Sequence, residues 1–162
     1  NICVVNFSPT LLSSQIQSKL CVNPELRDKS DSARYWRLRK IYMYHRRFFR
    51  EDYGDDEFFM LSAFQDRISG RPNEYLTGGT GLPTLIKWLE TQADSNNCYV
   101  LSGRRKMQFL QPLLEYDAEH WIGMNQEHDF QHCAPDKNVF LPFPIYFPGT
   151  AYNLNFVMET EE

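Results

Sequence analysis

Three glycines occur within four residues directly before a predicted helix, in the stretch TGGTGLPTLIKWLE, Thr77 to Glu90. A helix N-terminus carries unpaired amides and the positive end of the helix dipole, so it attracts phosphate. Glycines before the helix let main-chain amides approach an oxygen without interference from a Cβ atom. Pro83 suits the first helical turn, where no intrahelical donor is lost. The stretch is therefore a candidate phosphate site, and a plain glycine turn before a helix is the alternative interpretation.

Two other kinds of chemistry have weaker support. A zinc-like spacing occurs in EHDFQHC, where two histidines would stand four residues apart on a helix, and a third lies nearby: His120, His128, His132 and Cys133. This group lacks the acidic partner and the paired cysteines of stronger zinc motifs, so we expect surface or hydrogen-bonded histidines. Cys98 and Cys133 have no neighbouring base, and Ser102 lacks a G-x-S-x-G turn. We therefore expect no nucleophile among them.

Length and composition indicate one domain over residues 1–162, because 162 residues that are 42% hydrophobic are enough for a core. The net charge of −4 provides no overall attraction to nucleic acid or to an anionic membrane. No apolar run approaches the ~20 residues of a membrane-spanning helix. The cysteines are scattered without C-x-x-C pairs, which favours reduced thiols in the cytoplasm. The chain starts at Asn1 rather than at a methionine, so a domain that is incomplete on its N-terminal side is an open alternative.

Hydrophobic periodicity predicts the elements that would position these residues. Strands are expected at 2–7, which should be buried, at 58–64, within 96–103 after a turn, and at 150–158; helices are expected at 10–20, about 31–50 and 83–92. Residues 104–136 are less regular, and three prolines within 137–149 suit an extended, edge-like path. This mixture favours an α/β domain in which helices pack on a mixed or mostly antiparallel sheet.

The order of the motifs resembles the C-terminal half of the GHKL ATPase family, and in particular its histidine-kinase-like ATP-binding domains. The resemblance covers about residues 58–158 and depends on FQDRISG, GGTGL, YVLSG and FPGTAYNLNF. It implies the Bergerat fold, a two-layer α/β sandwich in which helices cover one face of a mixed, mostly antiparallel sheet. It also implies that the chain binds ATP together with Mg²⁺.

The resemblance further implies roles for individual residues. Asp66 would accept a hydrogen bond from the adenine amino group, and Thr150 would support that aspartate. The glycine residues and their neighbours would enclose the base and the phosphates: Gly70, Gly78, Gly79, Thr80, Gly81 and Leu82. Residues 71–77 would form a short lid, and Arg67 or Arg71 would add positive charge. Ile68 departs from the pattern, because it stands where the family has the first glycine of its aspartate motif.

Hydrolysis is left open by the sequence, because active members carry an E-x-x-x-N helix and no Glu in this chain has Asn four positions later. Without that pair the chain shows neither a catalytic base nor a magnesium ligand. Three explanations stay open. The E-x-x-x-N helix lies outside this sequence, it has diverged, or the fold is kept for nucleotide sensing or assembly. The resemblance implies a nucleotide-controlled component of a bacterial sensing, stress or anti-phage system, acting on a partner protein or as a homo-oligomer.

The basic helix at 34–50 suggests a competing function. Its Lys and Arg side chains could contact nucleic-acid phosphates, and Trp36 or Tyr44 could stack on bases. The simpler interpretation is a core helix whose charged face is solvated or paired with EDYGDDE, residues 51–57, and we favour it because the whole chain is acidic. The alternative function is then a non-catalytic protein-interaction or RNA-associated module that keeps the fold without a nucleotide.

Overall fold

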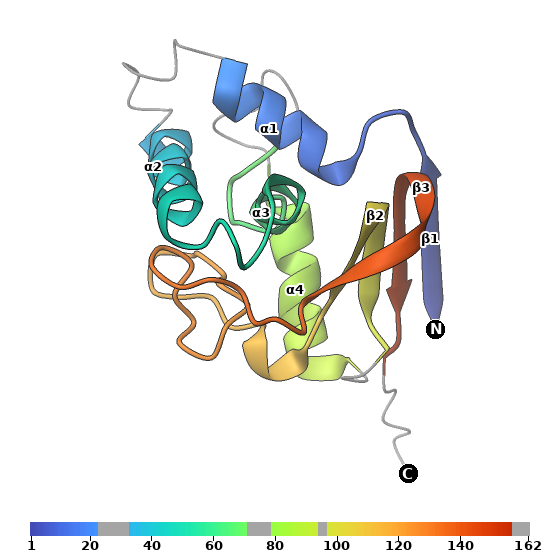
Figure 1. Ribbon diagram of the computed structural model, residues 1–162. Helices are drawn as coiled ribbons and strands as arrows, with labels where there is room; N and C mark the ends of the chain where they lie inside the picture. The colour runs from blue at the N-terminus through green and yellow to red at the C-terminus, as the bar shows by residue number, and fades with distance from the viewer. Residues whose placement is uncertain (23–32, 71–78, 94–96, 157–162) are drawn as a thin grey trace.

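The computed structural model describes residues 1–22, 33–70, 79–93 and 97–156 (Figure 1). Three strands form an antiparallel sheet in the order β1-β3-β2: β1 (Ile2–Phe7), β2 (Tyr99–Gln108) and β3 (Phe140–Leu154). The described helices lie to one side of this sheet: α1 (Leu12–Val22), α2 (Ala33–Phe48), α3 (Asp55–Ser62), α4 (Gly81–Gln92) and the short 3₁₀ helix η3 (Gln111–Leu113). The predicted mixed α/β class is confirmed. In the described ranges, no helix has the length and apolar character needed to cross a bilayer.

The three predicted helices and the first strand are confirmed, but the expected burial of residues 2–7 is wrong. Ile2 and Val4 are each 51% exposed, and Phe7 is 73% exposed. The reason is topological, since β1 is an edge strand that pairs only with β3 among the described strands. An apolar run indicates a strand but does not say what will cover its faces.

The C-terminal third forms one long strand rather than an extended path followed by a separate strand. Over 149–154, β3 lies between β1 and β2, whereas over 140–147 it pairs only with β2. Pro142, Pro144 and Pro148 fall outside the part that pairs on both sides. Proline cannot donate to a strand ladder, so the edge-like character expected from these prolines is confirmed for this part of β3.

The strand predicted at 58–64 is wrong, because residues 55–62 form α3. The apolar run there is continuous since the helix is buried on nearly every side, from Glu57 to Ser62. A short buried helix and a buried strand have the same apolar composition, so periodicity does not separate them. The helix start was nevertheless present in the sequence. Glu57 accepts the Gly54 amide at 3.0 Å, and three acidic residues occupy the first turn.

An aromatic cluster joins α2 and α3 to the irregular chain between β2 and β3. Phe58 of α3 is fully buried, and its ring stacks on Phe130 with the centroids 5.6 Å apart. His45 of α2 contacts both rings, and Trp121 stacks on the other side of Phe130. Much of the buried face predicted for α2 is confirmed, but Phe48 is 55% exposed because it lies on the side of the helix that carries the exposed Trp36 and Tyr44.

Phe58 and Phe48 provide a matched test of this core. We expect Phe58→Ala to lower the free energy of unfolding by about 3–5 kcal/mol, because it leaves a cavity among buried rings. Phe48→Ala should lower it by less than about 1 kcal/mol, since most of that ring is already in water. Urea unfolding monitored by circular dichroism measures both. Equal losses in the two variants would contradict the placement of the cluster.

His45 should make stability depend on pH. Burial lowers the pKa of His45 to about 4 from an ordinary value of 6.5, and its Nδ1 atom shares a hydrogen bond with the Tyr53 hydroxyl. Between these two pH values the unfolded chain binds the extra proton and the folded chain does not. The contribution of His45 is therefore complete above pH 6.5 and is lost as the pH falls toward 4.

We expect the stability difference between the wild type and His45→Gln to change by up to about 1.4 kcal/mol per pH unit in that window. Urea unfolding at a series of pH values gives this difference. Parallel pH profiles for the two proteins would show that His45 is not the responsible group.

Candidate functional site

Gly79 is required by the close packing of the glycine segment on the end of α3. Its φ angle is +85°, and its carbonyl oxygen accepts the Arg67 amide at 3.1 Å. A Cβ atom at this position would overlap the main chain of Ile68. This conformation accounts for the glycine without any ligand. Gly78 and the lid expected at 71–77 lie outside the described residues.

At the start of α4, two main-chain donors have no partner among the described residues. Thr80 precedes the helix, and its carbonyl oxygen accepts both the amide and the hydroxyl of Thr84. No side chain caps the first turn, and within the described residues the amides of Gly81 and Leu82 make no hydrogen bond. Gly81 is exposed, with no atom within 4 Å of a Cβ built on it. Among the described residues, nothing pairs with these two amides at the positive end of the helix dipole.

Asp66 lies next to this segment, as the sequence predicted, but its polar atoms have partners. Its carbonyl oxygen accepts a hydrogen bond from Arg34, and its carboxylate, which is 24% exposed, lies 3.8 Å from the Arg67 guanidinium. Gly70 contacts α1, because a Cβ there would be 2.6 Å from the Cβ of Gln15. The segment 66–70 therefore contacts both α1 and the glycine loop.

Thr150 is placed elsewhere, on the sheet. In the register of β3 it stands opposite Asn6 of β1 and Ser102 of β2, and no hydrogen bond or ion pair connects it to Asp66 within the described part of the chain. Residues directly opposite each other in an antiparallel pair share one face of the sheet. Ser102 identifies that face, since its hydroxyl accepts the Leu12 amide at the start of α1 at 3.1 Å. The three side chains therefore point toward the helices.

Asn6 is a candidate residue that the sequence analysis did not find. It is exposed, and its carboxamide can both donate and accept hydrogen bonds. Val4, two residues earlier on the same face, is 51% exposed and stands opposite Tyr152. A polar group thus borders an open apolar surface. The only signal in the sequence was an asparagine near the end of an apolar strand. No local sequence pattern predicts which strand pairs with the strand that carries Thr150.

In Figure 1, β1 lies at the outer edge of the sheet, whereas α4 starts among the helices beside it. The threonine and the glycine segment of the expected nucleotide site are thus on different elements, and Asn6 rather than Asp66 stands opposite the threonine.

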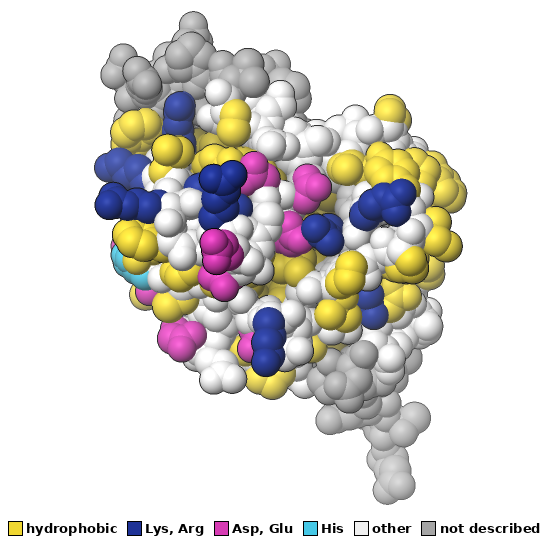
Figure 2. Space-filling model, in the orientation of Figure 1, with side chains coloured by type: hydrophobic (Ala, Val, Ile, Leu, Met, Phe, Trp, Pro, Cys, Tyr) yellow, Lys and Arg dark blue, Asp and Glu magenta, His cyan; other side chains and the backbone are white. Residues whose placement is uncertain are grey.

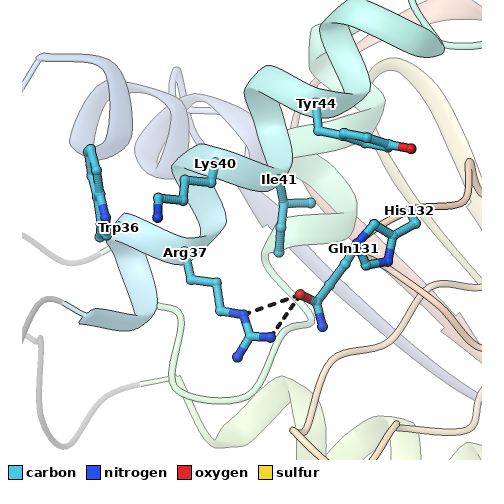
Figure 3. Close-up of a pocket in the computed structure, with 7 residues that line it drawn as sticks. All are labelled: Trp36, Arg37, Lys40, Ile41, Tyr44, Gln131 and His132. Carbon is cyan, nitrogen blue, oxygen red and sulfur yellow. Dashed lines mark hydrogen bonds between the residues drawn. The ribbon is translucent and has the colours of Figure 1, made fainter.

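A second candidate site is a groove of about 440 Å³ between α2 and residues 131–132 (Figure 3). Trp36 lies at one end, and Tyr44 stands at the other with His132, their ring centroids 5.7 Å apart. Arg37 forms part of the wall through two hydrogen bonds to Gln131, at 2.8 and 3.2 Å. Aromatic rings and cations line one open surface.

The charge on α2 is only partly neutralised. Among the described residues, Arg46 is the one side chain of 34–50 that forms an ion pair with the acidic stretch 51–57, through Asp55 at 3.4 Å. Arg37 also pairs with Glu119. The pairing expected with EDYGDDE thus involves one arginine, and much of the basic face is left to solvent.

The histidines do not form a metal centre in the described structure. His128 faces Glu115 at 3.7 Å, and His132 is held by Asp129 at 3.0 Å. Over the described ranges, no group of three His, Cys, Asp or Glu side chains could hold a metal ion. The described residues offer no such donor set for the implied Mg²⁺, so no residue is assigned to it.

Comparisons of the chain with protein-family models, curated proteins and solved structures give no match.

Two glycines of the same segment should respond in opposite directions to substitution by alanine. We expect Gly79→Ala to destabilise the fold by about 1–3 kcal/mol, because of its positive φ and the overlap with Ile68. Gly81→Ala should be neutral or stabilising by up to about 1 kcal/mol, since alanine favours a helix and the space is open. Thermal unfolding compares the two, and a destabilised Gly81→Ala variant would contradict this geometry.

Proposed function

We propose that this chain is an adenine-nucleotide-binding domain of the histidine-kinase-like GHKL type, with ATP as its ligand. The observation that carries the proposal is that Thr150 stands opposite Asn6, which is exposed, in the register of β3 and β1. The resemblance puts a threonine beside the residue that reads the base. The register supports Asn6 for that position.

Asn6 suits an adenine base chemically. Its carboxamide oxygen can accept from the adenine amino group while its NH₂ donates to a ring nitrogen, a pairing that asparagine makes with adenine in nucleic-acid complexes. The exposed face of Val4 offers apolar contact beside it. Asp66 would have to give up its contact with Arg67 to do the same.

The phosphates would lie at the start of α4. The amides of Gly81 and Leu82, which have no partner among the described residues, and the helix dipole favour negative charge there. Arg67 adds an exposed cation close by, because its side chain is 69% exposed and its amide donates a hydrogen bond to Gly79. Gly79 shapes this turn rather than contacting the ligand.

Binding rather than hydrolysis is the activity that the residues support. No E-x-x-x-N pair is present, and the described residues offer no magnesium donor set. We infer that nucleotide occupancy controls a partner protein in a bacterial sensing, stress or anti-phage system, with the cytoplasm as the compartment.

The two assignments of the base-reading residue give different results in one experiment. We expect ATP at about 100 times its Kd to stabilise the wild type by about 2.7 kcal/mol, seen as a rise in melting temperature. Asn6→Ala should abolish this shift, whereas Asp66→Ala should keep it. GTP serves as the control for base selectivity.

If Asp66→Ala lost the ATP-dependent rise in melting temperature and Asn6→Ala kept it, Asp66 would be the residue that binds the base. No shift with ATP, ADP or AMP would reject nucleotide binding. Gly79→Val is unsuitable as a binding variant, because the strain at that position would unfold the loop whether or not it binds phosphate.

A further inference from the structure

Three aromatic side chains and one lysine lie along one exposed row of α2. Trp36, Lys40, Tyr44 and Phe48 follow one another at four-residue steps, so they line the same side of the helix. The three rings are 37%, 36% and 55% exposed. In Figure 2 the hydrophobic and basic side chains lie beside each other on the side of the molecule where Figure 1 places α2. A merely solvated helix face has no need of three large rings in one row.

The cations of this row are available to a partner. Lys40 lies 5.5 Å from the centroid of the Trp36 ring, and Arg47 lies 5.2 Å from that of Phe48. Neither of them, nor Arg39, forms an ion pair with a described residue. Lys40 and Arg47 thus each stand beside an exposed ring.

We propose that this row and the adjoining groove bind single-stranded RNA. Trp36 and Tyr44 would stack on bases, while Lys40 and Arg47 would contact the phosphates between and beyond them. Single strands present a ring and a phosphate at every nucleotide, whereas a duplex hides its base faces and the carboxylates of an acidic peptide carry no ring. The surface therefore fits the chemistry of a single strand best.

His132 favours ribose over deoxyribose. Its Nδ1 atom is held by Asp129 at 3.0 Å, which fixes the ring beside Tyr44. Its Nε2 atom has no hydrogen-bond partner within the described ranges, and the side chain is 65% exposed. A 2′-hydroxyl can donate to or accept from such a nitrogen, and DNA lacks that group.

Helix α4 carries a matched control surface. Trp88 is 54% exposed and follows the exposed Lys87, but it lies on another helix and outside the groove. Trp88→Ala and Lys87→Ala therefore remove the same chemical groups without touching α2.

Fluorescence anisotropy with a labelled, unstructured RNA 12-mer tests the proposal on the full chain. We expect Trp36→Ala to weaken binding about ten-fold through lost stacking, without changing the salt dependence. Lys40→Ala should lower the slope of log affinity against log salt by about 0.7, the value for one phosphate contact on a single strand. Trp88→Ala and Lys87→Ala should bind like the wild type. Circular dichroism confirms that each variant is folded.

Each other outcome would overturn the proposal. No binding at low salt, or equal losses in the Trp36 and Trp88 variants, would remove the site. Equal affinity for DNA of the same sequence would reject the ribose contact. Tighter binding of a poly-glutamate peptide would replace RNA with an acidic protein segment. Because the RNA site on α2 and the proposed nucleotide site are separate, saturating ATP should leave RNA binding unchanged. A failure of the RNA proposal is therefore distinguishable from a failure of nucleotide binding.

Discussion

The buried amide of Gln65 is the interaction on which the arrangement of the helices and the irregular chain depends. Its Oε1 atom accepts the Ile122 amide at 2.8 Å, and its Nε2 atom donates to the Ile122 carbonyl at 2.9 Å. The side chain thus makes both main-chain hydrogen bonds of Ile122 that a neighbouring strand would otherwise make, and it is fully buried. A lost partner would leave buried polar groups unsatisfied, which costs more than the bond contributes.

Asn125 extends the same principle and shapes one wall of the groove. Its carboxamide donates to the carbonyl oxygens of Asp129 and Ala134 and accepts the Asp129 amide at 3.0 Å. These bonds turn the chain back so that Gln131 and His132 face α2. The irregular region between β2 and β3 is therefore an ordered support, and the groove depends on buried amides far from the surface row.

Two glycines of the chain are explained by main-chain packing without any ligand. Gly149 has a φ of +120°, and a Cβ there would overlap the carbonyl oxygen of Asn6, just as one on Gly79 would overlap Ile68. Both glycines are needed by the packing of main chain on main chain. A glycine-rich resemblance is therefore weak support for a phosphate site. The amides of Gly81 and Leu82, which have no hydrogen-bond partner in the described ranges, carry more weight.

The sequence by itself determined the elements whose signals are local. The helical periodicity of 10–20, 31–50 and 83–92, and the prolines of 142–148, predicted structure that the fold retains. Tertiary contacts decided the rest. The apolar run at 58–64 lies largely in a helix that is buried on nearly all sides. Strand β1 is exposed because it lies at the edge of the sheet. Thr150 stands opposite Asn6 rather than beside Asp66. Strand pairing joins residues more than 140 positions apart, and no local pattern of side chains encodes that choice.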